Sequence, residues 1–364
     1  MINRLKIVAA GVILVVGIAS CYSILPPQTR ALYKNLRKVS DKGFMFGHQD
    51  ATVYGIGWEG DSARSDVKSV CGDYPAVCGW DLGRIEFGGE KSLDKVPFEK
   101  IRKEIVAQYL RGGLNTVSWH VNNPLTGGDA WDVKNDSVVT SILPGGAKHE
   151  LFLTWLDKLA VFFNSLTTAN GKKVPVLFRP WHEHTGNWFW WGKSHCTPEQ
   201  YKALWKMTHD YLHSRGVNNL LYAYSPGDVS IKEEYTERYP GDKYVDLLGF
   251  DCYQFNGEQG VDGYISTMNR MLTYLTQLGK EHKKPIAVTE TGLEALTMNK
   301  WWTEVLFKIL DKYPVTYVLV WRNARERPNH FYAPYPGQSS SVDFIQFYNN
   351  KKTLFSRDIK SLYK

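Results

Sequence analysis

Apolar residues along this chain follow two alternating patterns. Short, nearly continuous apolar runs recur at intervals of roughly 30–40 residues, which is typical of strands that are covered on both faces. We predict eight such strands, at residues 43–47, 76–80, 114–119, 174–179, 219–224, 245–250, 285–289 and 315–320.

The segments between these runs carry apolar residues at helical spacing. Residues 98–111, for example, place Phe98, Ile101, Ile105 and Tyr109 on one face. Further helices are predicted at residues 150–163, 199–214 and 262–278. Alternating strands and helices indicate an α/β protein with a parallel sheet. Eight strands without a glycine-rich nucleotide-binding turn favour the (β/α)8 TIM barrel, with a doubly wound sheet as the alternative.

Polar and aromatic residues follow nearly every predicted strand. In a barrel the carboxyl ends of all strands meet at one face, where the active site is built. Residues at these positions are therefore the candidates for chemistry: His48, Gln49 and Asp81, then Trp119 and His120, then the segment 179–184, then Asp251 to Tyr253, Glu290, and finally Trp321 and Arg322.

Two of these residues are glutamates at matched positions. Glu183 follows the fourth predicted strand and Glu290 the seventh, so both side chains can face one bound group across the barrel mouth. Glycoside hydrolysis requires such a pair, one carboxyl to protonate the leaving oxygen and one to attack or to activate water. The alternative for a single glutamate is a buried ion pair, for example between Glu183 and Arg179.

An aromatic run directly follows the first glutamate. Gly186 to Gly192 reads GNWFWWG, in a chain with 13 Trp and 14% aromatic residues. Successive residues cannot all face the same side, so we expect at least one of these rings to pack in the core and others to offer surfaces for sugar rings. A tryptophan beside a carboxylic acid is also expected to raise the pKa of that acid.

Several motifs together carry a family resemblance. RPWHEHTGNWFWWG at 179–192 and VTETGLE at 288–294 resemble glycoside hydrolase family 26, a family of retaining (β/α)8 enzymes that are mainly β-mannanases. The similarity extends from Phe46 onward, through FGHQ at 46–49, GWDLG at 79–83, SWHVNNP at 118–124, YSPG at 224–227, GFDCY at 249–253 and VWRNA at 320–324.

The resemblance implies a role for each matching site residue. Glu183 would be the acid/base and Glu290 the nucleophile. His182 and Tyr253 would orient the substrate or the nucleophile, and Trp188 and Trp321 would bind sugar. His120 and Arg322 would lie towards the non-reducing end of the substrate, and Asp251 would also contact it. It implies no cofactor and no metal ion.

The implied substrate is a β-1,4-linked mannan, galactomannan or glucomannan. Cleavage of β-1,3-xylan or mixed-linkage β-glucan is the alternative within the same fold and mechanism. Two other classes remain open. His182 and His184 could be ligands of a metal-dependent hydrolase, and the aromatic residues would also suit a glycan-binding lipoprotein that does not cleave sugar.

The N-terminus reads as an export signal. Arg4 and Lys6 precede an apolar run of 13 residues, Ile7 to Ala19, which is short for a membrane-spanning helix. Ile18 to Cys21 resembles a bacterial lipobox, so we predict cleavage before Cys21 and lipidation of that residue. The predicted organisation is a signal peptide at 1–20, a tether at 21–30 and one catalytic domain at 31–364, held at the bacterial cell envelope.

Charge and cysteine content narrow the possible partners. Residues 1–50 contain seven Lys or Arg against two acids, and residues 351–364 five against one, so the body of a chain of net charge +7 is slightly acidic. We therefore expect no nucleic-acid partner, and we expect a monomer. Export permits disulfide bonds among Cys71, Cys78, Cys196 and Cys252; Cys71 and Cys78 are close in sequence, while a free, buried Cys252 is equally compatible.

Overall fold

The computed structural model describes residues 25–359 and 362–364, and in them the predicted barrel is present. Eight parallel strands pair in one ring, which closes where β10 pairs with β1. In ring order they are β1 (Phe44–Gln49), β4 (Val77–Asp81), β5 (Leu114–Ser118), β6 (Val176–Arg179), β7 (Leu220–Tyr224), β8 (Leu247–Gln254), β9 (Ile286–Leu293) and β10 (Val315–Val320). All eight predicted strands are confirmed. The short β11 (Thr353–Leu354) adds to the start of β1, and β2 (Tyr54–Gly55) and β3 (Trp58–Glu59) form a separate hairpin.

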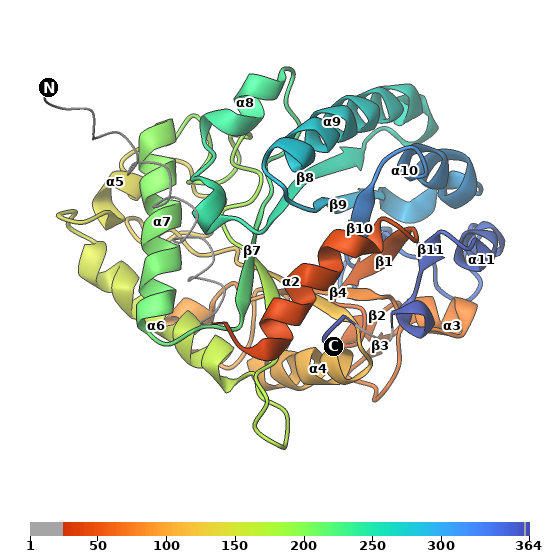
Figure 1. Cartoon of the computed structure of the whole chain (residues 1–364), viewed down its shortest axis with the longest axis horizontal. Helices are drawn as coiled ribbons and strands as arrows, with labels where there is room; N and C mark the ends of the chain where they lie inside the picture. Colours follow the sequence, from red (N-terminus) through yellow and green to blue (C-terminus); the bar gives the residue numbers. More distant parts are fainter. Residues whose placement is uncertain (1–24, 360–361) are drawn as a thin grey trace, which may run out of the picture.

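Helices surround this ring (Figure 1). They are α2 (Pro27–Val39), α3 (Asp66–Cys71), α4 (Phe98–Leu110), α5 (Val138–Ile142), α6 (His149–Ser165), α7 (Pro198–Ser214), α8 (Lys232–Glu237), α9 (Val261–Glu281), α10 (Lys308–Leu310, preceded by a π-helical stretch at Trp301–Phe307) and α11 (Ser341–Asn349). The four predicted helices correspond to α4, α6, α7 and α9. On α4, Phe98, Ile101 and Ile105 are buried as predicted.

Successive residues of each strand alternate between two apolar layers. In β1, Phe44 and Phe46 pack outward among the helices, whereas Met45 packs inside the barrel with residues from the other seven strands. This alternation follows from the two-residue repeat of a strand. The outer layer also takes up most of the tryptophans: eight of the 13 are almost fully buried, so the high aromatic content largely serves the core.

Helix α2 closes the amino end of the barrel. Its Leu32, Leu36 and Val39 join the interior cluster formed by the starts of the strands, and Figure 1 shows it crossing in front of the strands. The predicted tether at 21–30 was therefore too long, because α2 begins at Pro27. Proline fits the first turn of a helix, where its missing N–H has no helical partner to lose.

Strands β8 and β9 are longer than predicted and contain a register shift. Phe250 pairs with Val288, but the next pair is Asp251 with Glu290, which leaves Thr289 as an extra residue in β9. Such a β-bulge lets two consecutive residues face the same side of a strand. As a result Thr289 and Glu290 both reach the barrel mouth.

Two further predictions concern export. Each of the four cysteines Cys71, Cys78, Cys196 and Cys252 is a free thiol; Cys78 is buried in β4, while the thiol of Cys71 donates to the carbonyl of Asp73. No helix within the described residues has the length and apolar content needed to cross a membrane. The predicted signal peptide and Cys21 lie outside the described residues.

Candidate active site

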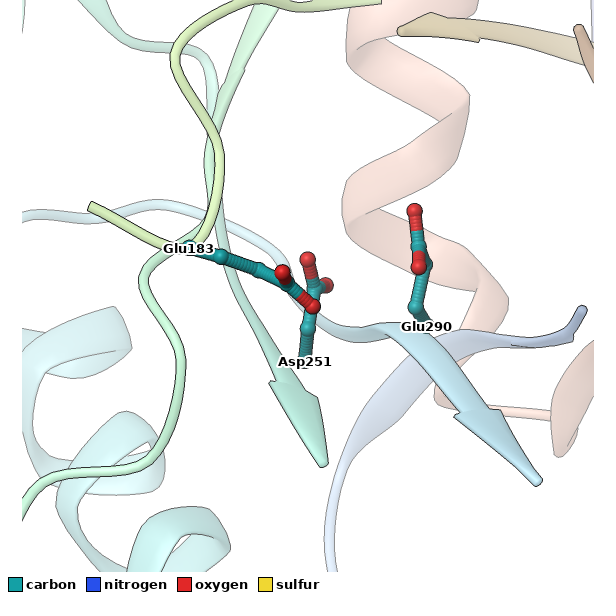
Figure 2. A group of neighbouring side chains, drawn as sticks. All are labelled: Glu183, Asp251 and Glu290. Carbon is teal, nitrogen blue, oxygen red and sulfur yellow. The ribbon is translucent and has the colours of Figure 1, made fainter. Parts of the chain in front are cut away.

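Three carboxylates converge at the carboxyl end of the barrel. Glu183 lies in the loop after β6, Asp251 on β8 and Glu290 on β9 (Figure 2). One oxygen of each lies within 4.8 Å of the others. The carboxyl groups of retaining glycosidases are about 5–5.5 Å apart, and those of inverting enzymes about 6.5–9.5 Å, so this spacing fits direct attack by one of the glutamates.

Arg179, the last residue of β6, binds two of these carboxylates. Its guanidinium donates to Asp251 at 2.7 Å and also to Glu290. Both partners raise the pKa of Arg179 and outweigh the cost of its burial. The expected alternative, an ion pair between Arg179 and Glu183, does not form, and Glu183 keeps its carboxyl free for another partner. Arg179 was among the strand-end candidates, but its bonds to Asp251 and Glu290 were not predicted.

Asp251 is the buried partner of Arg179. It is 3% exposed and accepts hydrogen bonds from Ser225 and Thr289 at 2.8 and 2.7 Å, besides that from Arg179. Burial raises the pKa of Asp251 well above its usual value, with Arg179 opposing the effect. Because Arg179, Ser225 and Thr289 occupy both carboxylate oxygens of Asp251, we describe it as a residue that positions Arg179 and not as the substrate ligand that we expected.

The loop that carries Glu183 has an unusual backbone. Trp181 and Glu183 both have positive φ, 53° and 54°, a conformation that costs a non-glycine residue of order 1–3 kcal/mol. The surroundings hold it in place: the N–H of Glu183 donates to Ser225 at 2.7 Å, and Tyr201 donates to the carbonyl of Trp181 at 2.9 Å. The positive φ of Glu183 turns its side chain towards the carboxyl end of the barrel, where Asp251 and Glu290 lie (Figure 2).

The protonation of Glu183 is set by its surroundings. Removal from water, together with the negative charge of Glu290, raises the pKa of Glu183 to about 7. Trp188, 46% exposed, donates its indole N–H to Glu183 at 2.6 Å. The expected rise of the Glu183 pKa is present, with burial as its largest cause, while this hydrogen bond from Trp188 opposes it. The predicted division of the aromatic run is confirmed, because Trp190 and Trp191 are buried in the core.

Two histidines line the same mouth. His120 bonds Asp81 through Nδ1 at 2.7 Å, and its Nε2 lies 3.2 Å from Nε2 of His182. Burial opposes the charged form of His120, but the carboxylate of Asp81 outweighs it and raises the pKa. Burial and the charge of Arg179 lower the pKa of His182 well below its usual value. His120 can therefore donate a hydrogen bond from its Nε2 to Nε2 of His182, while Nδ1 of His182 is buried and has no partner among the described residues.

Further predicted residues surround this group. Tyr253 donates to Glu290 at 2.8 Å, and the ring of Trp321 lies 6.2 Å from that of His120. Sequence reasoning missed Trp131, which is 44% exposed and stacks on His120 at 5.3 Å. Its signal was weak, because it lies in a long polar loop beyond the strand end.

Arg322 belongs to a second, neighbouring group of charges. It pairs with Glu326 at 2.7 Å and with Asp94 at 3.2 Å. Tyr54 donates to Asp50 at 2.6 Å in the same region, and burial together with the charge of Asp94 raises the pKa of Asp50 to about 8. The structure thus brings Arg322 to the same end of the barrel but gives it carboxylate partners of its own.

The histidine pair proposed for a metal hydrolase does not converge. His182 faces His120, whereas His184 packs between Tyr201 and Tyr224, with ring centroids 4.3 and 4.9 Å away. Glu183, Asp251 and Glu290 have the spacing of a possible cation site, but Arg179 already supplies positive charge to two of them.

Comparison with known proteins agrees with this site. A profile of glycosyl hydrolase family 26 matches residues 26–290. The chain belongs to this family. Similar proteins include a mannan endo-1,4-β-mannosidase of Bifidobacterium adolescentis, 32% identical over 90% of this chain and 34% of its own length. Another, from Bacillus subtilis, is 32% identical over 70% of this chain and 68% of its own. The chain thus spans about a third of the first relative and two thirds of the second.

Solved family 26 structures agree with the barrel. A β-mannanase from Bacteroides ovatus superimposes with a TM-score of 0.91 at 57% identity, covering 93% of this chain and 97% of that one. An endo-β-1,4-mannanase double mutant from Cellulomonas fimi gives 0.85 at 33% identity, covering 94% and 79%.

Proposed function

We propose that this family 26 glycoside hydrolase is a retaining endo-β-1,4-mannanase, with Glu183 as acid/base and Glu290 as nucleophile. The observation that carries the role assignment is the unequal setting of the two glutamates. Glu290 accepts hydrogen bonds from Arg179 and Tyr253, and the guanidinium of Arg179 forms an ion pair with it. Glu183 has a pKa raised to about 7, and among the described residues its carboxylate accepts one hydrogen bond, from Trp188.

The reaction then takes two steps. Glu290 attacks the anomeric carbon while Glu183 gives its proton to the leaving oxygen, so that the glycosidic bond breaks and a glycosyl ester forms on Glu290. In the second step Glu183 takes a proton from water, and the resulting hydroxide attacks the same carbon and releases Glu290. Two inversions retain the anomeric configuration.

The pKa of Glu183 follows this cycle. The charge of Glu290 helps to raise it in the free enzyme, so Glu183 is protonated when an acid is needed. Once Glu290 is esterified that charge is gone, and the pKa of Glu183 falls at the moment when a base is needed. One carboxyl therefore serves both steps without any movement of the chain.

The substrate assignment rests on the relatives named as mannan endo-1,4-β-mannosidases. Product analysis on mannan, galactomannan, glucomannan, β-1,3-xylan and mixed-linkage glucan tests it, with proton NMR of the first product to report the anomer. We expect β-configured oligosaccharides from the mannans. Preferential cleavage of xylan or mixed-linkage glucan would contradict the proposed substrate, and an α-configured first product would contradict the retaining mechanism.

The proposed location is the bacterial cell envelope, with a lipid anchor on Cys21. It is supported by the charged start, the apolar run and the lipobox-like Ile18 to Cys21. Replacing Cys21 with Ala should move the protein from the membrane to the soluble fraction in an export-competent host, with unchanged activity on galactomannan. Membrane association that survives this change would contradict lipidation at Cys21.

A further inference from the structure

The basic segments at both ends of the chain lie together at the closed end of the barrel. Helix α2 contains four Lys or Arg and no acid, and it covers the amino end of the strands. The C-terminal residues pack against it, since the side chain of Asn35 donates to the carbonyls of Leu362 and Lys364 at 3.1 Å. The basic residues near the two ends of the sequence are therefore concentrated at one end of the barrel.

An open pocket of about 400 Å³ lies on this face, between the ends of α2 and α9 and the start of β9. It has a basic rim, made by Arg37, Lys280, Lys283 and Lys284, and no acidic residue lines it. Arg37, Lys280 and Lys283 are exposed, while Lys284 is half-buried and donates to the carbonyl of Asp242 at 2.9 Å. We call this site the basal pocket.

The surroundings extend the positive surface of the basal pocket. Lys34, Lys38 and Lys42 are exposed on α2 and the turn after it. Four carboxylates in these surroundings lie outside the pocket lining. Asp41 and Glu281 are exposed, Asp242 bonds the ring of His282 at 2.8 Å, and the charge of Asp246 acts on Lys284. A phosphate group suits this setting, because lysine and arginine together supply several N–H donors to its oxygens.

The position of Leu25, the first described residue, favours the phosphate of a membrane lipid as the ligand of the basal pocket. Leu25 packs against the same interior cluster as α2, and the four residues back to Cys21 can span at most about 14 Å. A lipid on Cys21 would hold this face close to a membrane, and the strands run from it towards the carboxylates. The active site would then open away from the lipid.

The geometry points to the basal pocket as a binding site for the headgroup of an anionic phospholipid, with the closed end of the barrel resting on the membrane. This inference rests on the proposed lipid anchor for its orientation, but the pocket can be tested separately. Anionic lipid attracts basic surfaces whether or not a protein is anchored.

The test is amide hydrogen exchange of the full chain with vesicles of phosphatidylcholine alone or with one part in three of phosphatidylglycerol. We expect exchange in residues 34–43 and 279–286 to slow several-fold with the anionic vesicles only. The triple variant Arg37→Glu, Lys280→Glu, Lys283→Glu should lose this protection. The matched control is Lys91→Glu, Lys134→Glu, Lys300→Glu, which makes the same change in net charge on exposed loops that follow strands, and it should keep the protection.

Several outcomes would overturn the inference. Equal loss in both triple variants would mean a general charge effect, and no protection by anionic vesicles would exclude the membrane. Protection by inorganic phosphate or by a single-stranded oligonucleotide, without protection by vesicles, would assign the pocket to a free anion or a polyanion. Co-sedimentation with phosphatidylcholine vesicles reports the anchor, and galactomannan hydrolysis reports the enzyme, so failure of either proposal is seen separately.

Discussion

The two ends of the barrel use charge in opposite ways. At the carboxyl end, His120, Arg179, Asp251 and Glu290 are almost fully buried and bonded to one another or to close neighbours. At the amino end, the interior is a plug of apolar side chains under α2, and the charges lie outside it, on exposed residues such as Lys34 and Lys38. Burying a charge costs free energy but allows neighbouring groups to shift its pKa, whereas an exposed charge costs little and is screened by water and salt.

The strongest test of the carboxyl end removes the two glutamates in turn. Glu290→Ala should lower activity on every substrate by on the order of 10⁴-fold or more, because no nucleophile remains. Glu183→Ala should lower it steeply only for poor leaving groups, while aryl glycosides with good leaving groups still form the glycosyl-enzyme and then stall. Initial rates on galactomannan and on an aryl β-mannoside measure the difference.

Azide separates the two roles. It needs no general base, so it should restore turnover of the aryl mannoside by the Glu183→Ala variant and yield a β-mannosyl azide. A β-azide product from the Glu290→Ala variant would mean that the two roles are reversed.

The next test compares a buried arginine with an exposed one. Arg179→Ala leaves Asp251 and Glu290 buried without their counter-charge, and should lower the free energy of unfolding by about 3–5 kcal/mol. Arg215, just past the end of α7 at the amino end, pairs with Asp157 in solvent; Arg215→Ala should leave the free energy of unfolding almost unchanged. Urea unfolding of both variants measures the difference. Equal losses would contradict the contrast between the two ends.

The smallest expected effect is a shift in the pH profile. Glu183 must be protonated in the first step, so kcat/KM should fall as pH rises through about 7. Trp188→Phe removes the hydrogen bond that lowers the pKa of Glu183, and the alkaline limb should move to higher pH. Trp131→Phe is the control, because Trp131 stacks on His120; it should leave the limb in place.

The sequence predicted most accurately what burial dictates. The eight strands are continuous apolar runs, and burial on both faces allows few alternatives for such runs. Strands β8 and β9 continue through Asp251 and Glu290, which the apolar pattern cannot indicate because those positions serve the site. Helix α2 was read as partly tether, since its proline-rich start resembles a linker. The role of Arg179 was missed for a different reason: its partners come from β8 and β9, which are distant in sequence.

The positions of the charged residues could likewise be predicted only in part. The sequence revealed that the basic residues are concentrated near the chain ends, but only the packing of residues 362–364 against α2 brings both ends to one face. The motif around Glu183 indicated an acid beside a tryptophan. It could not indicate that Trp188 donates a hydrogen bond to the acid, because that depends on the positive φ of Glu183.

The bulge in β9 means that this strand cannot lose a residue next to Glu290 without moving the Glu290 side chain. Because Thr289 is an extra residue opposite β8, it and Glu290 both face the mouth: Thr289 bonds Asp251 and Glu290 bonds Tyr253. Deletion of one residue there would restore a regular ladder and turn the Glu290 side chain towards the helices. Loops around the cleft tolerate insertions and deletions far better, so new substrate preferences can arise in the loops, while the spacing between Val288 and Glu290 has to stay constant.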